Sequence, residues 1–257
     1  YDTKADARTT EQLLRTETEF LPNTHLLMGT VRGESAKVVA EYAREKKIPF
    51  VSPFSASSNV TEENPYYIQV NPTLATHLEV VTRHLRDNYN TDQIVIVTQN
   101  DRSQFDRMQY IQQLNAALAG SSFTPQLEHL TISDDSPNLG KTDLTKFIRT
   151  GRETVFFVPL WEDKQFIYAF LRKAFIANQD NPVIVYGMPQ WKSFDYVDYN
   201  YYENLSVHIS SEFYIDPYIT DIREFKRRYF DAYGKTPSAE SYRGYDDMLY
   251  FGRLLNK

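Results

Sequence analysis

The chain has 257 residues, enough for one large domain or two of ordinary size, and its 41% hydrophobic residues indicate a folded globule with an ample core. A net charge of −6, without any long block of Lys or Arg, argues against nucleic acid as a general partner. The absence of cysteine excludes disulfides, thiolate metal sites and a cysteine nucleophile. No apolar run approaches the roughly 20 residues that a membrane-spanning helix needs, so the chain is not expected to cross a membrane.

Predicted strands and helices alternate along the chain, which is typical of an α/β fold with largely parallel sheets. In chain order the first predicted elements are a strand end at 1–2, a helix at 10–20, a strand at 25–29, a helix at 35–47, and strands at 48–52 and 66–70. They are followed by a helix at 73–88, a strand at 93–101, a helix at 103–118, a strand at 127–132, a short helix at 144–151, a strand at 154–160, a helix at 164–178 and a strand at 183–187. The last are an irregular Tyr-rich stretch at 194–202, a strand with its flanks at 203–213, and helices at 219–233 and 241–255.

The stretch from 25 to 58 predicts a strand–helix–strand unit. HLLMG is a short buried strand that stops at Gly29, SAKVVAEYAREKK is an amphipathic helix, and IPFVS is the next strand, followed by the polar loop PFSASS. We expect parallel strands joined by a right-handed crossover. Ligands of such sheets bind beyond the carboxyl ends of the strands, here near Gly29–Ser35 and Ser52–Ser58.

Four motifs carry a resemblance to a known family. YDTKADA at the start is similar to a strand-end "YDD" followed by a helix, and the spacing from Gly29 to Val51–Pro53 is kept. IVIVTQND and SYRGYDDMLYFGRLL are similar to a second-lobe strand and to a late "YDA" helix. Together they resemble the type I periplasmic binding proteins, specifically the leucine/isoleucine/valine-binding branch of solute receptors, over nearly the whole chain.

The resemblance implies two Rossmann-like lobes joined by crossover hinge strands, with a ligand held in the cleft between them. Lobe one would comprise 1–73 plus 212–257, and lobe two 74–211. Asn71–Thr73 and Ser210–Tyr214 would be two of the crossovers. In the family a central strand and a helix of lobe one precede the segment that starts at Tyr1. We therefore expect upstream residues, with an export signal.

The sequence departs from the family pattern in the first lobe. The family grips an amino acid's carboxylate with small hydroxyl residues and backbone N–H groups on two loops. The position expected to carry Ser is Gly33, which follows Arg32. The position expected to carry Thr is Ala56, although Ser55 and Ser57 flank it.

The second lobe departs as well. The first aromatic residue of the family's site is met only loosely, by Ser103 or Phe105, and the second lies near Trp161. The carboxylate that would hold the amino group has no counterpart, because Pro189 stands there, beside Gln190. A buried ammonium group without a counter-charge is poorly held. The scaffold is thus expected to be retained while the amino-acid signature is lost.

Candidate ligand contacts lie just past the predicted strand ends. Arg32 and Arg102 could clamp an anionic group, although solvated loop arginines are the common alternative. Trp161 and Trp191 could form cleft walls or serve ordinary packing. The predicted ligand-binding residues are Arg32, Gly33, Ser55, Ser57, Arg102, Ser103, Phe105, Trp161 and Gln190.

Nothing in the sequence predicts catalysis. No nucleophile–base pair, GxSxG, P-loop or GxGxxG motif is present. The five histidines do not fall at metal-ligand spacing, and His77 and His84 are expected on the surface of one helix. No cofactor or metal is expected.

Two functional classes therefore remain open. One is an extracytoplasmic solute receptor that closes on a polar or anionic small molecule and serves a membrane transporter or envelope partner. The other is a degenerate binding-protein fold that acts as a protein-interaction module of the cell envelope without a small-molecule ligand. A cleft plugged by Phe54, Phe105 or Trp191 would favour the second class. An enzyme is a distant third.

Overall fold

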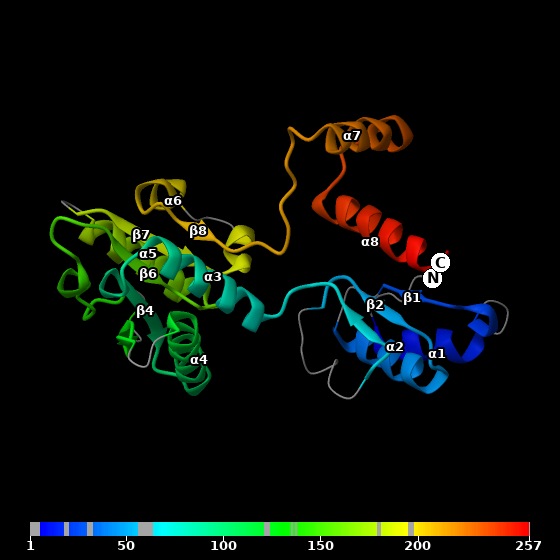
Figure 1. Ribbon diagram of the computed structural model, residues 1–257, viewed down its shortest axis with the longest axis horizontal. Helices are drawn as coiled ribbons and strands as arrows, with labels where there is room; N and C mark the ends of the chain where they lie inside the picture. The colour runs from blue at the N-terminus through cyan, green and yellow to red at the C-terminus, as the bar shows by residue number, and fades with distance from the viewer. Residues whose placement is uncertain are drawn as a thin grey trace. The chain divides into compact units, whose positions relative to one another are not determined.

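The computed structural model describes residues 6–17, 21–29, 33–55, 64–120, 124–134, 136, 138–178, 181–194 and 198–256. The chain divides into two compact units. Unit 1 comprises Tyr1–Thr73 and Phe213–Lys257, and unit 2 comprises Leu74–Glu212. Within the described ranges every strand pair is parallel, which confirms the predicted α/β class (Figure 1).

Unit 1 contains a three-stranded sheet in the order β1-β2-β3. Its elements up to residue 73 are α1 (Ala7–Thr16), η1 (Leu21–Asn23), β1 (Leu27–Met28), α2 (Gly33–Lys46), β2 (Phe50–Ser52) and β3 (Tyr67–Gln69). The predicted strand–helix–strand unit is therefore present, and β1 pairs with β2 in parallel. Three alanines and a valine of α2 are buried against Phe50 and Tyr67, whose rings meet edge to face at 5.6 Å. Their small side chains let the helix backbone lie close to the sheet.

Two helix starts in unit 1 differ from the prediction. The first helix begins at Ala7 rather than Thr10, because Asp6 accepts a hydrogen bond from the Thr9 amide and so caps the helix there. The first crossover helix begins at Gly33 rather than Ser35. The predicted strand end at Tyr1–Asp2 lies outside the described residues. Beyond residue 213, unit 1 continues with α7 (Thr220–Tyr233) and α8 (Ala239–Leu255).

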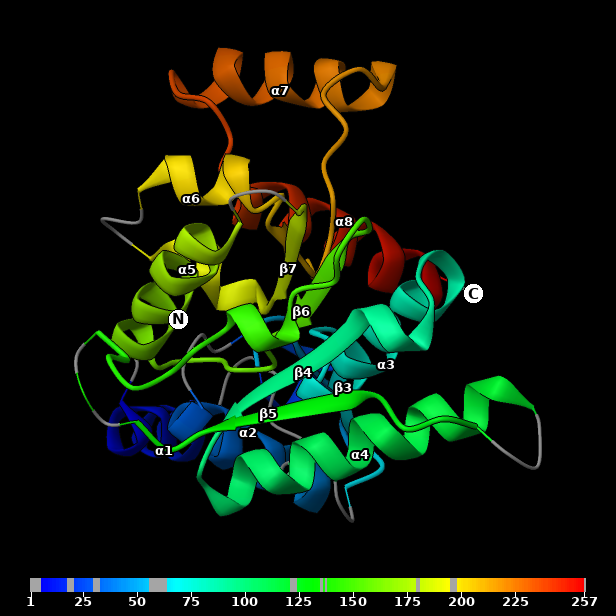
Figure 2. The ribbon, with the colours of Figure 1, turned by 90° about the vertical axis from the view of Figure 1, so that its left-hand side faces the viewer.

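Unit 2 is a doubly wound sheet in the order β5-β4-β6-β7-β8, with α3 and α4 covering one face and α5 and α6 the other (Figure 2). This is the flavodoxin-like order 2-1-3-4-5, in which the strand order reverses between the first and third strands. The elements of unit 2 are α3 (Leu74–Asn88), η3 (Thr91–Gln93), β4 (Ile94–Gln99), α4 (Arg102–Ala119), β5 (Glu128–Ile132), η4 (Thr145–Phe147), β6 (Thr154–Phe157), α5 (Lys164–Ala177), β7 (Val183–Gly187), η5 (Pro189–Ser193), α6 (Tyr199–Asn204) and β8 (His208–Ile209).

The core of unit 2 forms around β4, β6 and β7, whose described residues are almost entirely buried. Trp191 is only 1% exposed, and its indole N–H donates to the Leu160 carbonyl at 2.9 Å. The ring lies where a side chain at position 187 would be, since a Cβ on Gly187 would fall 2.4 Å from it. Trp191 is therefore a core residue of unit 2, and the expectation that it could line or plug a cleft is wrong.

Three further predictions for unit 2 are corrected. The helix expected at 144–151 is only the single turn η4, because the backbone is extended again at Ile148. Part of the stretch expected to be irregular forms α6, which Asp198 caps by accepting from the Asn200 amide. His77 is 6% exposed, so it is buried rather than on the surface.

Candidate functional site

The exit edge of unit 2 is the side of its sheet on which β4, β6 and β7 end, formed by residues 99–102, 158–161 and 188–192. Ligands of doubly wound sheets bind beyond the strand ends, at the point where the strand order reverses. In unit 2 this point lies between β4 and β6. The exit edge is therefore the place in unit 2 to look for a site.

Polar side chains hold the backbone in place where the strand order reverses between β4 and β6. The Gln99 side chain donates to Asp163 at 2.8 Å and thereby joins the end of β4 to the start of α5. Gln104 is hydrogen-bonded twice to Gln99, once through the backbone amide and once through the side chain, both at 2.7 Å. Asp163 also accepts from the Phe166 amide and so caps α5. Arg102 and Trp161 lie within a few residues of these hydrogen-bonded side chains.

An aromatic pair stands at the end of β6. The half-buried indole of Trp161 meets the imidazole of His77 edge to face, with centroids 5.9 Å apart. His77 comes from the first turn of α3. Burial lowers the pKa of His77, the Glu212 carboxylate raises it and the Lys192 ammonium lowers it. Sequence spacing gave no sign that His77 takes part, because the residue belongs to a regular amphipathic helix.

Lys192 and Gln190 add polar groups to the exit edge. The Lys192 ammonium donates to the Ser211 hydroxyl at 2.5 Å. The side-chain oxygen of Gln190 is buried and has no hydrogen-bond partner, as is the hydroxyl of Ser210. Buried acceptors normally have a donor, so the Gln190 oxygen is an acceptor that remains available for a hydrogen bond. An aromatic wall, a cation and an acceptor that lacks its donor suit a small polar molecule.

The predicted residues on α4 differ in what they can do. Arg102 and Phe105 are exposed, Phe105 by 53%. Phe105 therefore does not fill a cavity within unit 2. The Ser103 hydroxyl and amide both bind the Asp101 carboxylate, at 2.6 and 2.7 Å, which caps the helix and lowers the pKa of Asp101. Ser103 thus stabilises the first turn of α4, whereas Arg102 and Phe105 are exposed to solvent.

In unit 1 the predicted residues lie near the ends of β1 and β2. Gly33 is the first residue of α2, and Ser55 is half-buried after β2. Arg32 and Ser57 lie outside the described residues. Two serines that the sequence did not single out, Ser35 and Ser52, are fully buried, and neither hydroxyl has a hydrogen-bond partner. Unit 1 thus also contains buried hydroxyl groups that have no hydrogen-bond partner.

Sequence reasoning missed an arginine in unit 1. Arg243 of α8 stacks over the rings of Phe54 and Phe213, with its guanidinium carbon 5.6 and 5.7 Å from the two centroids. It also donates to the Asn71 side chain at 3.2 Å. The motif that contains Arg243 predicts a helix, but it does not reveal contacts with three segments that are distant in the sequence.

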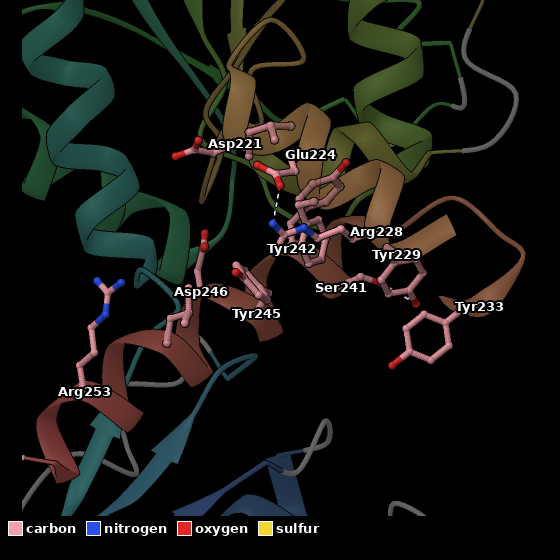
Figure 3. Close-up of a pocket in the computed structure, with 13 residues that line it drawn as sticks. Asp221, Glu224, Arg228, Tyr229, Tyr233, Ser241, Tyr242, Tyr245, Asp246 and Arg253 are labelled. Carbon is pink, nitrogen blue, oxygen red and sulfur yellow. Dashed lines mark hydrogen bonds and ion pairs between the residues drawn. The ribbon is translucent and has the colours of Figure 1, made fainter. Parts of the chain in front are cut away.

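A cavity of about 630 Å³ lies between α7 and α8, within unit 1 (Figure 3). Phe225 is one of the lining residues, and the centroid of its ring lies 4.8 and 4.7 Å from those of Tyr242 and Tyr245. Ser241 donates to the Tyr229 hydroxyl at 3.2 Å. None of the predicted ligand-binding residues lines this cavity, and its rings pack the two helices against each other.

Two searches among the described residues bear on other classes of site. No three His, Cys, Asp or Glu side chains there come together as metal ligands. Nor does any helix within the described ranges combine the length and the apolar character that a membrane crossing requires.

Comparison with known proteins decides the family. The family model described as "Periplasmic binding protein" matches residues 2–257. The chain belongs to the periplasmic binding protein family. The resemblance seen in the sequence is thereby confirmed. No curated protein matches this periplasmic binding protein in sequence.

Solved structures share the fold of this periplasmic binding protein at low sequence identity. An ABC transporter substrate-binding protein from Desulfitobacterium hafniense has a TM-score of 0.64 and 11% identity over 97% of this chain and 69% of its own. A leucine-binding protein from Thermotoga maritima has a TM-score of 0.51 and 14% identity, covering 96% and 68%. A solute-binding protein from Rhodopseudomonas palustris, in complex with 3,4-dihydroxybenzoic acid, has a TM-score of 0.51 and 17% identity, covering 96% and 65%. The chain thus spans about two thirds of the length of these proteins.

Proposed function

We propose that the protein is an extracytoplasmic solute-binding protein that closes on a small polar or anionic molecule and serves a membrane transporter. Membership of the periplasmic binding protein family supports binding without chemistry. The observation that carries the ligand class is the buried Gln190 oxygen without a donor, on the same exit edge as the Lys192 ammonium.

The chemistry of the exit edge narrows the ligand. Lys192 suits a carboxylate, the Gln190 oxygen suits an O–H or N–H donor, and the Trp161 ring suits a flat apolar face. A hydroxylated aromatic or other unsaturated acid has all three features. The relative from Rhodopseudomonas palustris was solved with such an acid, so hydroxybenzoates head the screen. Ser55 in unit 1 and Arg102, Trp161 and Gln190 in unit 2 are the proposed ligand contacts that the structure describes.

A thermal-shift screen tests the proposal. At a ligand concentration 100 times the Kd, the folded state gains about 2.7 kcal/mol. Each kcal/mol moves the melting temperature of a chain of this size by roughly 2–4 °C, so a true ligand should raise it by about 5–10 °C. The screen covers hydroxybenzoates, other organic anions, sugars, nucleosides and peptides.

Matched variants locate the site. Trp161→Ala and Arg102→Ala should each shrink the ligand-induced shift, whereas Arg83→Ala, an exposed arginine of α3 paired with Glu79, should leave it unchanged. A ligand whose shift survives both Trp161→Ala and Arg102→Ala binds elsewhere. A broad screen without any shift would instead favour the interaction-module alternative.

A further inference from the structure

The chain passes between the units twice, and Arg243 contacts it next to both passages. Asn71 lies two residues before Thr73, at which the first part of unit 1 ends, and Phe213 is the residue at which the second part begins. The guanidinium of Arg243 bonds to Asn71 and stacks on Phe213. One side chain on α8 therefore holds the unit 1 end of both connections.

Further contacts fix the Asn71 end. The Asn71 side-chain amide donates to the Phe54 carbonyl at 3.1 Å, and the Gln69 side chain donates to the Asn71 carbonyl at 2.8 Å. Phe54 also supplies the second ring over which Arg243 lies. A planar guanidinium can stack and donate at the same time, whereas a lysine ammonium cannot do both in this way.

The unit 2 ends of the connections are fixed separately. Leu74 begins α3 and packs against the core of unit 2. Ser211 accepts from Lys192 at 2.5 Å. Pro72 and Thr73 lie between these contacts in the first connection and Glu212 lies between them in the second, and the ring of Pro72 restricts its own backbone.

We propose that Arg243 is a positioning residue that pins these two connections to unit 1, so that fewer backbone angles in them can change when one unit moves relative to the other. Hinges in two-unit binding proteins are a few residues that absorb the change in backbone angles. By holding Asn71 and Phe213 in unit 1, Arg243 reduces the number of residues in these two connections that can move. The link to ligand closure rests on the proposed function, but the pinning itself does not.

The test uses the whole chain without any ligand. Because the sequence contains no cysteine, single cysteines for spin labels can be placed at Glu45 in unit 1 and Asp87 in unit 2, both exposed. Pulsed electron resonance then gives the distribution of distances between the labels, and hydrogen exchange reports on the Asn71, Thr73 and Phe213 amides.

Arg243→Gln should broaden the distance distribution and speed exchange at these amides about tenfold or more. Arg243→Lys, which keeps the charge without the planar fork, should fall between Arg243→Gln and the parent chain. The matched control is Arg253→Gln, which removes the same charge from an exposed position of α8 and should change neither measurement. In the Arg243→Gln background, Asn71→Ala should add little, because the two residues share one interaction.

Unchanged exchange at Asn71 and Phe213 in both Arg243 variants would overturn the proposal, as would equal broadening by Arg253→Gln. Melting curves of each variant confirm that it is folded, and Arg243→Lys provides the milder change if Arg243→Gln unfolds. Since no ligand is present, failure of solute binding would leave these results intact, and failure of the pinning would leave solute binding intact.

Discussion

His77 and Trp161 meet edge to face at an angle of 65°, although 84 residues of chain separate them and one lies on a helix while the other follows a strand. The contact buries the imidazole, and burial is the largest cause of its lowered pKa. It also makes the stability of unit 2 sensitive to acid.

The first prediction follows from three histidines of unit 2. The pKa values of His77, His129 and His208 all lie below the usual 6.5, in each case chiefly because of burial. Below about pH 6.5 the unfolded chain binds more protons than the folded chain, so stability is fully present above that pH and is lost as the pH falls through the folded-state pKa values. The melting temperature should therefore decrease between pH 7.5 and 5.5, and His77→Phe should reduce the decrease. A flat profile over this range would contradict the burial of the His77 ring.

A second prediction concerns Gly187 and Trp191. An alanine at 187 would place its Cβ 2.4 Å from the indole, so Gly187→Ala should destabilise the protein by about 1–3 kcal/mol. Gly252→Ala is the opposite case, because no atom lies within 4 Å of the added Cβ and the residue is inside α8. It should stabilise the chain by about 0.5–1 kcal/mol. Urea unfolding measures both, and equal effects of the two substitutions would refute the tight Trp191 packing.

Asp247 gives the third prediction. Its carboxylate is buried in α8, one oxygen has no hydrogen-bond partner, and burial raises its pKa above 3.8 while Arg243 lowers it and Asp246 raises it. Because the folded-state pKa is raised, stability is lost as the pH rises through that value. Asp247→Asn should therefore raise the melting temperature at pH 7, by roughly 2–4 °C for each kcal/mol relieved, with a smaller gain near pH 4. Asp246→Asn, at the exposed neighbouring position, serves as the control and should have little effect.

The fourth prediction concerns amino acids. Pro189 stands where the resemblance places the carboxylate that holds the ligand's amino group, and Gly33 where it places a serine. Free leucine, isoleucine and valine should therefore bind weakly or not at all in calorimetry at millimolar ligand. Micromolar affinity for any of them would show that the residue placement is wrong, and Glu212 would then be the first carboxylate to substitute.

The sequence predicts those parts of the fold in which a single periodic pattern of apolar residues determines whether the segment is a helix or a strand. Leu78, Val81 and Leu85 recur at helical spacing and are buried along α3, and the run IVIVT is the buried strand β4. The helix expected from Leu144 failed because its start is a tight turn around Asp143, which accepts from Thr145, and the Arg149 amide bonds to the Thr154 hydroxyl instead of continuing a helix. Local side-chain competition of this kind leaves no trace in hydrophobic spacing.

Residues of the candidate site could be singled out from the sequence only where they follow the ends of predicted strands. Trp161 and Gln190 were singled out because they follow the ends of β6 and β7 within a few residues, and their role in binding stays a prediction. His77, Lys192 and Arg243 were not, because each acts through partners far away in sequence: Trp161, Ser211 and Asn71. Trp191 was misjudged for the same reason, since only the missing side chain of Gly187 reveals that the indole points inward.

The contacts of Arg243 with both Asn71 and Phe213 bear on how the two units could be separated experimentally. Within this chain unit 2 is one continuous stretch that interrupts the sequence of unit 1, and the guanidinium of Arg243 contacts Phe213 at one boundary and Asn71, two residues before the other. A bridge of a few glycines and serines from Thr73 to Phe213 should therefore close unit 1 without strain. Unit 1 can then be titrated and mutated without unit 2.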